Sequence, residues 1–356
     1  MKAIAVQRGE SRPRVIEKSR PVPEPGSNEV LVRTLRVGID GTDHEVIEGN
    51  HGGFPEDENH LVLGHEAVGV VEEPNGTGLE TGDVVVPTVR RPPETGRNRY
   101  FEAGEPDMAP AGEYVECGIA GAHGFMAEYF VAPAEFLVPV PRESAQYAFL
   151  VEPISNSEKA LDLAWSSRST FEWQPESAVV LGNGPLGLLT LAMLRREFDR
   201  TYCLGRRDRP DPTIDIIENL GAVYVDSRET AVAEIPATHE PMDLVYEATG
   251  YAKHAFECVD ALGPNGVGVL LGIPGDWEFE IDGGRLHREF VLKNKALVGS
   301  VNSSVPHFED ARDSLATFPD WFLDALITGV YTPADVDTAF EDGDTDIKAV
   351  IEFEAP

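Results

Sequence analysis

The feature that most constrains the fold is an alternation of apolar strand patterns and helical patterns after residue 153. Strand patterns occur at 177–181, 201–204, 222–225, 243–247 and 266–271. Helical patterns separate them, and two of these stop at a glycine, Gly221 and Gly263. A strand, a helix and a second strand form a right-handed crossover on a parallel sheet. This half of the chain therefore predicts an α/β domain with a parallel sheet.

The first 140 residues or so follow a different pattern, in which Gly and Pro densely separate short strands. This pattern predicts an antiparallel, barrel-like unit with long loops. Residues 90–124 are rich in Pro, Gly and charge, so we expect a lobe or long loop there. Strand patterns at 290–301 and 349–354 suggest that the end of the chain returns to complete the first domain.

The length of 356 residues predicts about two domains. We place one at 1–154 together with 290–356, and the other at 155–289. No apolar run is long enough to span a membrane. The first residues lack the apolar core of a secretory signal, and three cysteines are too few for a disulfide framework. A soluble, cytoplasmic protein is expected.

The charge is strongly acidic, with 62 Asp and Glu against 29 Lys and Arg, a net charge of −33. Such self-repulsion opposes a compact state in dilute buffer, but at about 1 M salt the screening length falls to about 3 Å. The composition thus indicates a halophilic protein of a salt-rich cytoplasm. It disfavours nucleic acid as a partner, and any phosphate site must be built locally against this field.

A glycine-rich turn, Gly182-Asn183-Gly184-Pro185-Leu186-Gly187, follows the first strand of the α/β half. Gly182 permits the tight turn, Gly184 lets the backbone approach a pyrophosphate, and Gly187 allows close packing of helix and strand. Pro185 suits the first turn of a helix, whose free N–H groups attract phosphate. In this context the turn predicts a dinucleotide site.

The second strand predicts which dinucleotide binds. An acidic residue at its end would hold the ribose 2′-hydroxyl of NAD, but the chain has Gly205 followed by Arg206 and Arg207. Guanidinium groups match phosphate oxygens bidentately, so we predict NADP, with NAD also open. Residues at the ends of the later strands are expected on the nicotinamide side: Thr249, Leu271, Gly272 and Ile273.

Several motifs together resemble the zinc-dependent medium-chain alcohol dehydrogenase family over essentially the whole chain. These are Gly64-His65-Glu66 with Gly69, Gly82-Asp83-Val84-Val85, the glycine turn and Glu247-Ala248-Thr249-Gly250. Glu116-x-Gly118-Ile119, Gly124-Phe125-Met126 and the end of the chain are similar to the archaeal (halophilic) glucose 1-dehydrogenase branch. The resemblance implies a GroES-like β-barrel-type catalytic domain, an inserted doubly wound Rossmann domain and one catalytic zinc.

The resemblance also implies the zinc ligands. The family's first ligand is a cysteine, but the matching stretch here is Asp40-Gly41-Thr42-Asp43, so Asp40 stands in its place. His65 supplies an imidazole, Glu66 ligates directly or through water, and Glu152 either ligates or caps a helix. A set rich in oxygen loosens the preference for Zn²⁺ over Mg²⁺ or Mn²⁺. With Cys117 alone in the lobe, no structural zinc is expected.

On the same resemblance, zinc acts as a Lewis acid on the substrate hydroxyl and Thr42 relays its proton. The polar positions of the glucose branch match Glu116, Glu152, Asn156 and Asn302, with Thr42, and Val301 and Asn302 are expected beside the nicotinamide. The implied reaction is oxidation of β-D-glucose at C1 to D-glucono-1,5-lactone, in a homodimer or tetramer. Other zinc-dependent sugar, polyol or alcohol dehydrogenases, and a metal-free NADPH-binding protein of the superfamily, remain alternatives.

Overall fold

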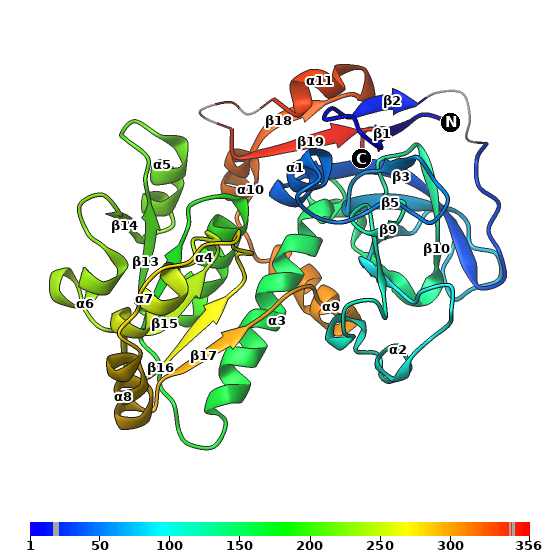
Figure 1. Cartoon of the computed structure of the whole chain (residues 1–356). Coiled ribbons are helices and arrows are strands. Elements are labelled where there is room, and N and C mark those ends of the chain that lie inside the picture. The colour runs from blue at the N-terminus through cyan, green and yellow to red at the C-terminus, as the bar shows by residue number, and fades with distance from the viewer. Residues whose placement is uncertain (17–20, 342, 344–345) are drawn as a thin grey trace. The chain divides into compact units, whose positions relative to one another are not determined.

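The computed structural model describes residues 1–16, 21–341, 343 and 346–356. They form two compact units (Figure 1). The first comprises Met1–Ser155 and Asn302–Pro356, and the second Asn156–Val301. Within the described residues, every helix is too short or too polar to cross a membrane.

The first unit is built on a seven-stranded sheet of order β11-β6-β5-β3-β19-β18, with β10 also paired to β3. Its strands are β3 (Glu29–Ile39), β5 (Glu66–Glu73), β6 (Val84–Pro87), β10 (Tyr129–Pro133), β11 (Leu137–Val140), β18 (Ile327–Tyr331) and β19 (Lys348–Glu352). The long strand β3 runs antiparallel to β5, β10 and β19. The last strand of the chain thus pairs with one of the first (Figure 1).

Smaller elements surround this sheet. A second sheet has the order β2-β1-β4, formed by β1 (Ala3–Gln7), β2 (Arg14–Ile16) and β4 (His60–Val62). The helices are α1 (Gly41–Glu48), the start of α3 (Val151–Arg168), α9 (Val305–Leu315), α10 (Asp320–Leu326) and α11 (Val336–Ala339). Of these, α1 follows β3 directly and so begins where that strand ends.

The predicted lobe at 90–124 is a small folded element. It contains β7 (Arg90–Arg91), α2 (Arg99–Ala103), β8 (Val115–Cys117) and β9 (Gly121–Ala122). Two buried arginines hold it together. Arg90 lies 3.7 Å from the centre of the Tyr114 ring and donates to the Asp107 carbonyl and to Glu116, while Arg91 lies over Phe136. Packing and hydrogen bonds therefore organise a region in which Cys117 is a free, buried thiol.

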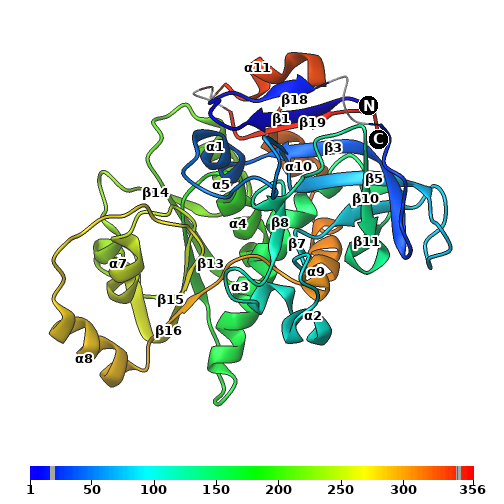
Figure 2. The same cartoon turned by 45° about the vertical axis from the view of Figure 1, so that its right-hand side comes forward.

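The second unit is a six-stranded, fully parallel sheet of order β14-β13-β12-β15-β16-β17. The strands are β12 (Ser177–Leu181), β13 (Arg200–Gly205), β14 (Val223–Asp226), β15 (Met242–Glu247), β16 (Leu262–Leu270) and β17 (Ala296–Gly299). The helices are α4 (Pro185–Glu197), α5 (Pro212–Asn219), α6 (Ile235–Thr238), α7 (His254–Ala261) and α8 (Gly283–Lys293). Helices α4 and α7 lie on opposite faces of the sheet (Figure 2). The strand order reverses between β12 and β15, where such sheets bind ligands.

The predicted strand at 290–301 is wrong in its first part. Residues up to Lys293 belong to α8, whose first turn is capped by the Asp282 side chain. The helix ends at Asn294, which has a left-handed φ of 50°, and β17 begins only at Ala296. Because β17 adds to the parallel sheet, residues 290–301 lie in the second unit, whereas the sequence assigned them to the first.

We expect the ion pair between Arg90 and Glu116 to be essential for the stability of the lobe. Both side chains are nearly buried, and Nε lies 3.0 Å from Oε1. Removing one partner of a buried pair leaves an unpaired charge, so Arg90→Met should lower the free energy of unfolding by about 3 kcal/mol. Adding Glu116→Gln should recover part of this loss.

The control is Arg97→Met in the same lobe, whose pair with Glu135 is exposed. It should change the free energy of unfolding by about 1 kcal/mol or less. Unfolding in denaturant at high salt measures all three variants. Equal losses in Arg90→Met and Arg97→Met would contradict this account.

Candidate metal centre and cofactor site

Asp40 lies between β3 and α1 and is the N-cap of that helix. Its carboxylate Oδ1 accepts a hydrogen bond of 2.5 Å from the Thr42 N–H, and Asp43 Oδ2 accepts one from the Asp40 N–H. This reciprocal capping box fixes the orientation of the Asp40 carboxylate. The same carboxylate also faces His65.

His65 precedes β5, and a close contact between backbones fixes its position. A Cβ atom on Gly124 would lie 2.3 Å from the Gly64 carbonyl oxygen, so only glycine fits at that point. The Phe125 N–H donates to the same oxygen at 2.9 Å. Gly64, Gly124 and Phe125, which belong to the motifs that carry the family resemblance, thus support the loop that carries His65.

Asp40, His65 and Glu66 converge into one group whose ligand atoms lie within 4.8 Å of one another. Asp40 Oδ1 lies 3.7 Å from His65 Nε2, too far for a hydrogen bond. Two ligands of a tetrahedral zinc ion, each at about 2.1 Å, lie about 3.4 Å apart. Glu66 is fully buried, and its Oε1 has no hydrogen-bond partner among the described residues. Buried polar atoms rarely remain unpartnered, so the group fits a divalent cation.

Lys348 was not singled out from the sequence, but it belongs to this group. It opens β19 near the end of the chain, is 2% exposed, and places Nζ 2.5 Å from Glu66 Oε2. Burial lowers its pKa, but the charges of Glu66 and Asp40 outweigh this, and the net pKa is raised. A sequence signal existed, since Lys348 is one of only seven lysines and opens an apolar strand.

Asp43 is the second residue that sequence reasoning left without a role. It is buried, its Oδ1 accepts from the Gly64 N–H at 3.2 Å, and the same oxygen lies 3.9 Å from His65 Nδ1. Burial raises its pKa, with the charge of His65 opposing. Asp43 therefore links the helix that presents Asp40 to the loop that presents His65.

Burial and nearby charges favour the protonated forms of His65 and Glu66, where a cation would bind. Burial lowers the pKa of His65, but the surrounding carboxylates, led by Asp43 and Asp40, outweigh it and raise the pKa to about 9. Burial raises the pKa of Glu66 to about 7, against the charge of Lys348. An imidazole must lose its proton to bind a metal, so a cation entering the group displaces that proton.

Glu152 and the predicted sugar contacts lie in several elements. Glu152 is buried in the first turn of α3, and its charge acts on both His65 and Glu66. Asn156 follows one turn later on the same helix. Asn302 adopts a left-handed φ of 56°, and its Nδ2 donates to Glu116 Oε1 at 3.2 Å. Within the first unit, the structure thus brings Glu116 and Asn302 into contact.

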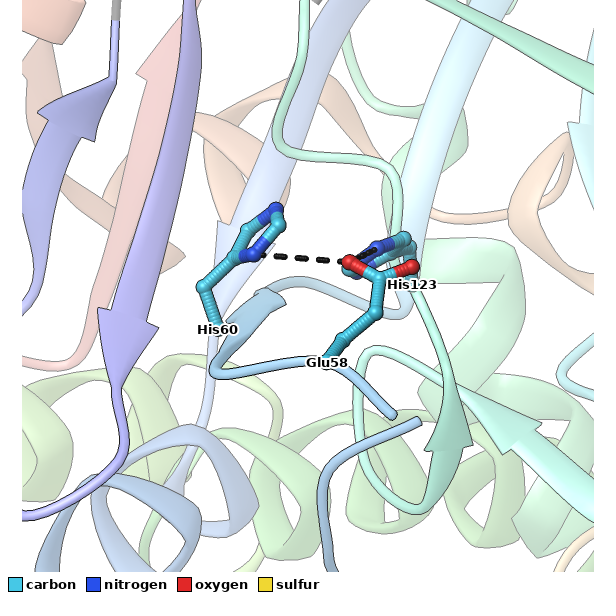
Figure 3. Close-up of side chains that lie close together, drawn as sticks. All are labelled: Glu58, His60 and His123. Carbon is cyan, nitrogen blue, oxygen red and sulfur yellow. Dashed lines mark hydrogen bonds and ion pairs between the residues drawn. The ribbon is translucent and has the colours of Figure 1, made fainter. Parts of the chain in front are cut away.

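A second group of potential ligands, Glu58, His60 and His123, lies elsewhere in the first unit (Figure 3). His123 Nδ1 accepts from the Val62 N–H at 3.1 Å, so in the neutral ring the proton is on Nε2. That nitrogen lies 2.9 Å from Glu58 Oε2 and donates to it. Both ring nitrogens of His123 thus have hydrogen-bond partners, and we interpret the group as a hydrogen-bonded support for β4.

The glycine turn has the geometry that a dinucleotide requires. Gly182 has a φ of 112°, and a Cβ on Gly187 would lie 2.0 Å from the Gly182 carbonyl oxygen. Gly184 is the N-cap of α4, with Pro185 in the first turn, and among the described residues no side chain caps the helix. A Cβ on Gly184 would meet nothing within 4 Å. The open helix N-terminus fits a pyrophosphate, and Asn183 and Leu186 complete the turn.

The remaining predicted cofactor residues follow the carboxyl ends of strands. Arg206 and Arg207 follow β13 and are exposed. The Thr249 hydroxyl and amide both donate to buried Glu247, which fixes the loop after β15. Leu271 and Gly272 follow β16, and Ile273 and Val301 are exposed. All the cofactor residues predicted from the sequence lie in the second unit, except Asn302, which lies in the first.

Comparison with known proteins agrees with this architecture. Residues 26–142 match the alcohol dehydrogenase GroES-like domain, and residues 145–353 match the glucose dehydrogenase C-terminus. A glucose 1-dehydrogenase of Haloarcula marismortui is 64% identical over 355 residues, covering 100% of both chains. The structure of Haloferax mediterranei glucose dehydrogenase in complex with NADP, Zn and gluconolactone is 63% identical, with 100% coverage of both chains and a TM-score of 0.98. Escherichia coli L-idonate 5-dehydrogenase (TM-score 0.80, 20% identity, 99% and 98% coverage) shares the fold.

The two units define the medium-chain alcohol dehydrogenase fold, with a GroES-like unit and a Rossmann unit. Within that fold, the chain belongs to the glucose dehydrogenase family, in the branch found in halophilic archaea. The resemblance on which the sequence analysis relied is thereby confirmed.

The metal group can be tested by zinc content. We expect about one zinc per chain in the purified protein and much less in Asp40→Ala and His65→Ala, because each removes a ligand. His44→Ala is the matched control, since it removes an imidazole from α1 outside the group. Elemental analysis after gel filtration measures the ratio. Equal loss in His44→Ala would refute the assignment, and two zinc ions per chain would show that the group at Glu58 also binds.

Proposed function

We propose that the chain oxidises β-D-glucose at C1 to D-glucono-1,5-lactone and reduces NADP⁺, with zinc as Lewis acid. The observation that carries the proposal is the group of Asp40, His65 and Glu66, of which His65 and Glu66 are buried and whose donor atoms fit a divalent cation. Family membership adds the substrate, because relatives 64% identical over their full length are glucose 1-dehydrogenases.

Asp40, His65, Glu152 and Glu66 would hold the zinc, the last directly or through water. When bound, zinc lowers the pKa of a sugar hydroxyl and so eases its deprotonation, and the nicotinamide ring accepts the hydride. Lys348 favours the charged form of Glu66 and fixes its position through their 2.5 Å contact. Thr42, next to the Asp40 cap and partly exposed, is suited to pass the substrate proton toward solvent.

The sugar requires hydrogen-bonding partners for several hydroxyl groups, because buried polar groups without partners are costly. Glu116 offers such a partner. Its Oε1 is taken by Arg90 and Asn302, and Oε2 has no hydrogen bond within the described parts of the chain. We assign Glu116, Asn302, Glu152 and Asn156 to the sugar, together with Thr42.

NADP is the proposed cofactor, with NAD as an alternative. The open N-terminus of α4 fits the pyrophosphate, and Arg206 and Arg207 suit the 2′-phosphate. We expect Arg206→Ala to raise the KM for NADP⁺ by about tenfold and to leave that for NAD⁺ nearly unchanged. Steady-state kinetics with both nucleotides measure this. An equal increase for both would show that Arg206 does not contact the 2′-phosphate.

We also propose a homodimer, or a tetramer, in a salt-rich cytoplasm. At one edge of the parallel sheet, β17 has one neighbour in the part of the chain that the structure describes, β16, and the preceding helix exposes Leu292 to 75% and Val291 to 61%. Exposed apolar groups beside a free strand edge favour association of two copies. The net charge of −33 favours high salt, and the three cysteines are free. Light scattering at molar salt measures the mass.

The proposed reaction is tested by glucose-dependent reduction of NADP⁺ at molar salt. We expect activity with glucose and its loss on treatment with a chelator, followed by recovery on adding Zn²⁺. Sorbitol and threonine serve as control substrates for other dehydrogenases on this fold. Full activity in protein shown by elemental analysis to contain no metal would refute the zinc mechanism, and faster turnover of a control substrate would refute glucose.

A further inference from the structure

The hydroxyl of Tyr224 is hydrogen-bonded to the backbone of the arginine loop, residues 206–209, which follows β13. Tyr224 lies on β14, beside Cys203 on β13. Its hydroxyl accepts a hydrogen bond from the Arg207 N–H at 2.9 Å and donates one to the Arg207 carbonyl at 3.0 Å. The backbone N–H and the carbonyl of Arg207 are therefore both hydrogen-bonded to the Tyr224 side chain.

The arginines near this loop differ in their partners. Arg209 forms an ion pair with Glu218, and Arg228 pairs with Asp226 and Asp208. Arg228 Nη2 also lies 3.4 Å from the Arg207 carbonyl oxygen. These two cations are neutralised by carboxylates and tie the loop to its surroundings.

The two arginines proposed to bind the 2′-phosphate are held less tightly by carboxylates. Arg206 forms no ion pair within the described residues, and Arg207 Nε lies 3.9 Å from Asp211 Oδ2, a long ion pair. The loop thus holds these two guanidinium groups at the carboxyl end of β13, next to the glycine turn.

Tyr224 also connects the loop to that turn. A Cβ on Gly205 would lie 2.9 Å from the Tyr224 ring and 2.7 Å from the Asn183 side chain. Asn183 in turn donates to the Thr213 hydroxyl at 2.6 Å. The ring, Gly205 and the dinucleotide turn are therefore packed in contact, so a shift of the ring would displace the start of the loop.

We propose that Tyr224 is a positioning residue that sets the preference for a 2′-phosphorylated nucleotide. This rests on the proposed use of NADP. Exposed arginine side chains are flexible, and fixing the peptide that carries them reduces the entropy lost when they bind phosphate. A nucleotide with a free 2′-hydroxyl makes no use of these arginines and gains nothing from their order. Tyr224 acts through Arg206 and Arg207, without touching the phosphate.

The test is Tyr224→Phe, which keeps the ring against Gly205 and removes both hydrogen bonds. Calorimetric titration at molar salt with 2′,5′-ADP and with 5′-ADP reports binding without turnover. We expect the Kd for 2′,5′-ADP to rise about tenfold, equivalent to about 1.4 kcal/mol, and the Kd for 5′-ADP to change about twofold or less. The kcat for glucose at saturating NADP⁺ should stay unchanged.

The matched control is Tyr202→Phe on the neighbouring strand β13. Its hydroxyl donates to Glu240 at 2.8 Å, and Glu240 precedes β15, at the amino end of the strands. This variant also loses a phenol hydroxyl, but away from the arginine loop, so both nucleotides should bind as in the parent protein.

Equal weakening of both nucleotides in Tyr224→Phe, or no change in either, would overturn the proposal. A parent protein that binds 2′,5′-ADP no more tightly than 5′-ADP would overturn the choice of NADP, and with it any selectivity for Tyr224 to set. If the protein does not oxidise glucose, the nucleotide titrations still test the role of Tyr224. Failure of the proposed reaction can therefore be told apart from failure of the proposal for Tyr224.

Discussion

The buried ion pair between Lys348 and Glu66 is the interaction on which the proposed metal centre depends. It joins the last strand of the chain to the residue after His65, and its 2.5 Å contact places a fixed positive charge among carboxylates. Asp40, Asp43, Glu66 and Glu152 together would repel one another strongly without a cation. Lys348 offsets part of this repulsion and leaves the group negative enough to attract a divalent ion.

Oxygen ligands change how the site is built compared with a thiolate site. A carboxylate such as that of Asp40 needs orientation, which the N-terminus of α1 provides through the Thr42 N–H. The imidazole needs a fixed loop, which the contact between Gly64 and Gly124 provides. Backbone groups thus orient both of these proposed ligands. In the lobe, buried Arg90 and Arg91 likewise provide order through hydrogen bonds.

Phosphate recognition works against the overall field of the protein. With a net charge of −33, long-range attraction of an anion is absent, and high salt screens what remains. In the proposed site, contacts at short range supply the affinity: the helix N-terminus at Gly184 and the guanidinium groups after β13. An exposed arginine contributes little binding free energy unless its side chain is ordered. Hydrogen bonds that fix the arginine loop, such as those of Tyr224, would therefore strengthen phosphate binding.

Much of the site was readable from local sequence. The turn at Gly182 and the pair Arg206 and Arg207 follow strands that the alternation of patterns located closely, and Asp40, His65 and Glu66 converge as the resemblance implied. Local patterns failed at 290–301, where an apolar run begins in the end of a helix, because its side chains fit either period.

By itself, the sequence determined the parallel sheet and the glycine-rich turn, since these depend on periodicity and on a short motif, while the proposed metal donors came from the family resemblance. Only the tertiary structure decided that Lys348 pairs with Glu66, that Arg90 pairs with Glu116 and that Tyr224 is hydrogen-bonded to Arg207. These partners are 17 to 282 residues apart in the chain. Their contacts depend on how strands pair in space, and no local pattern of residues encodes that pairing.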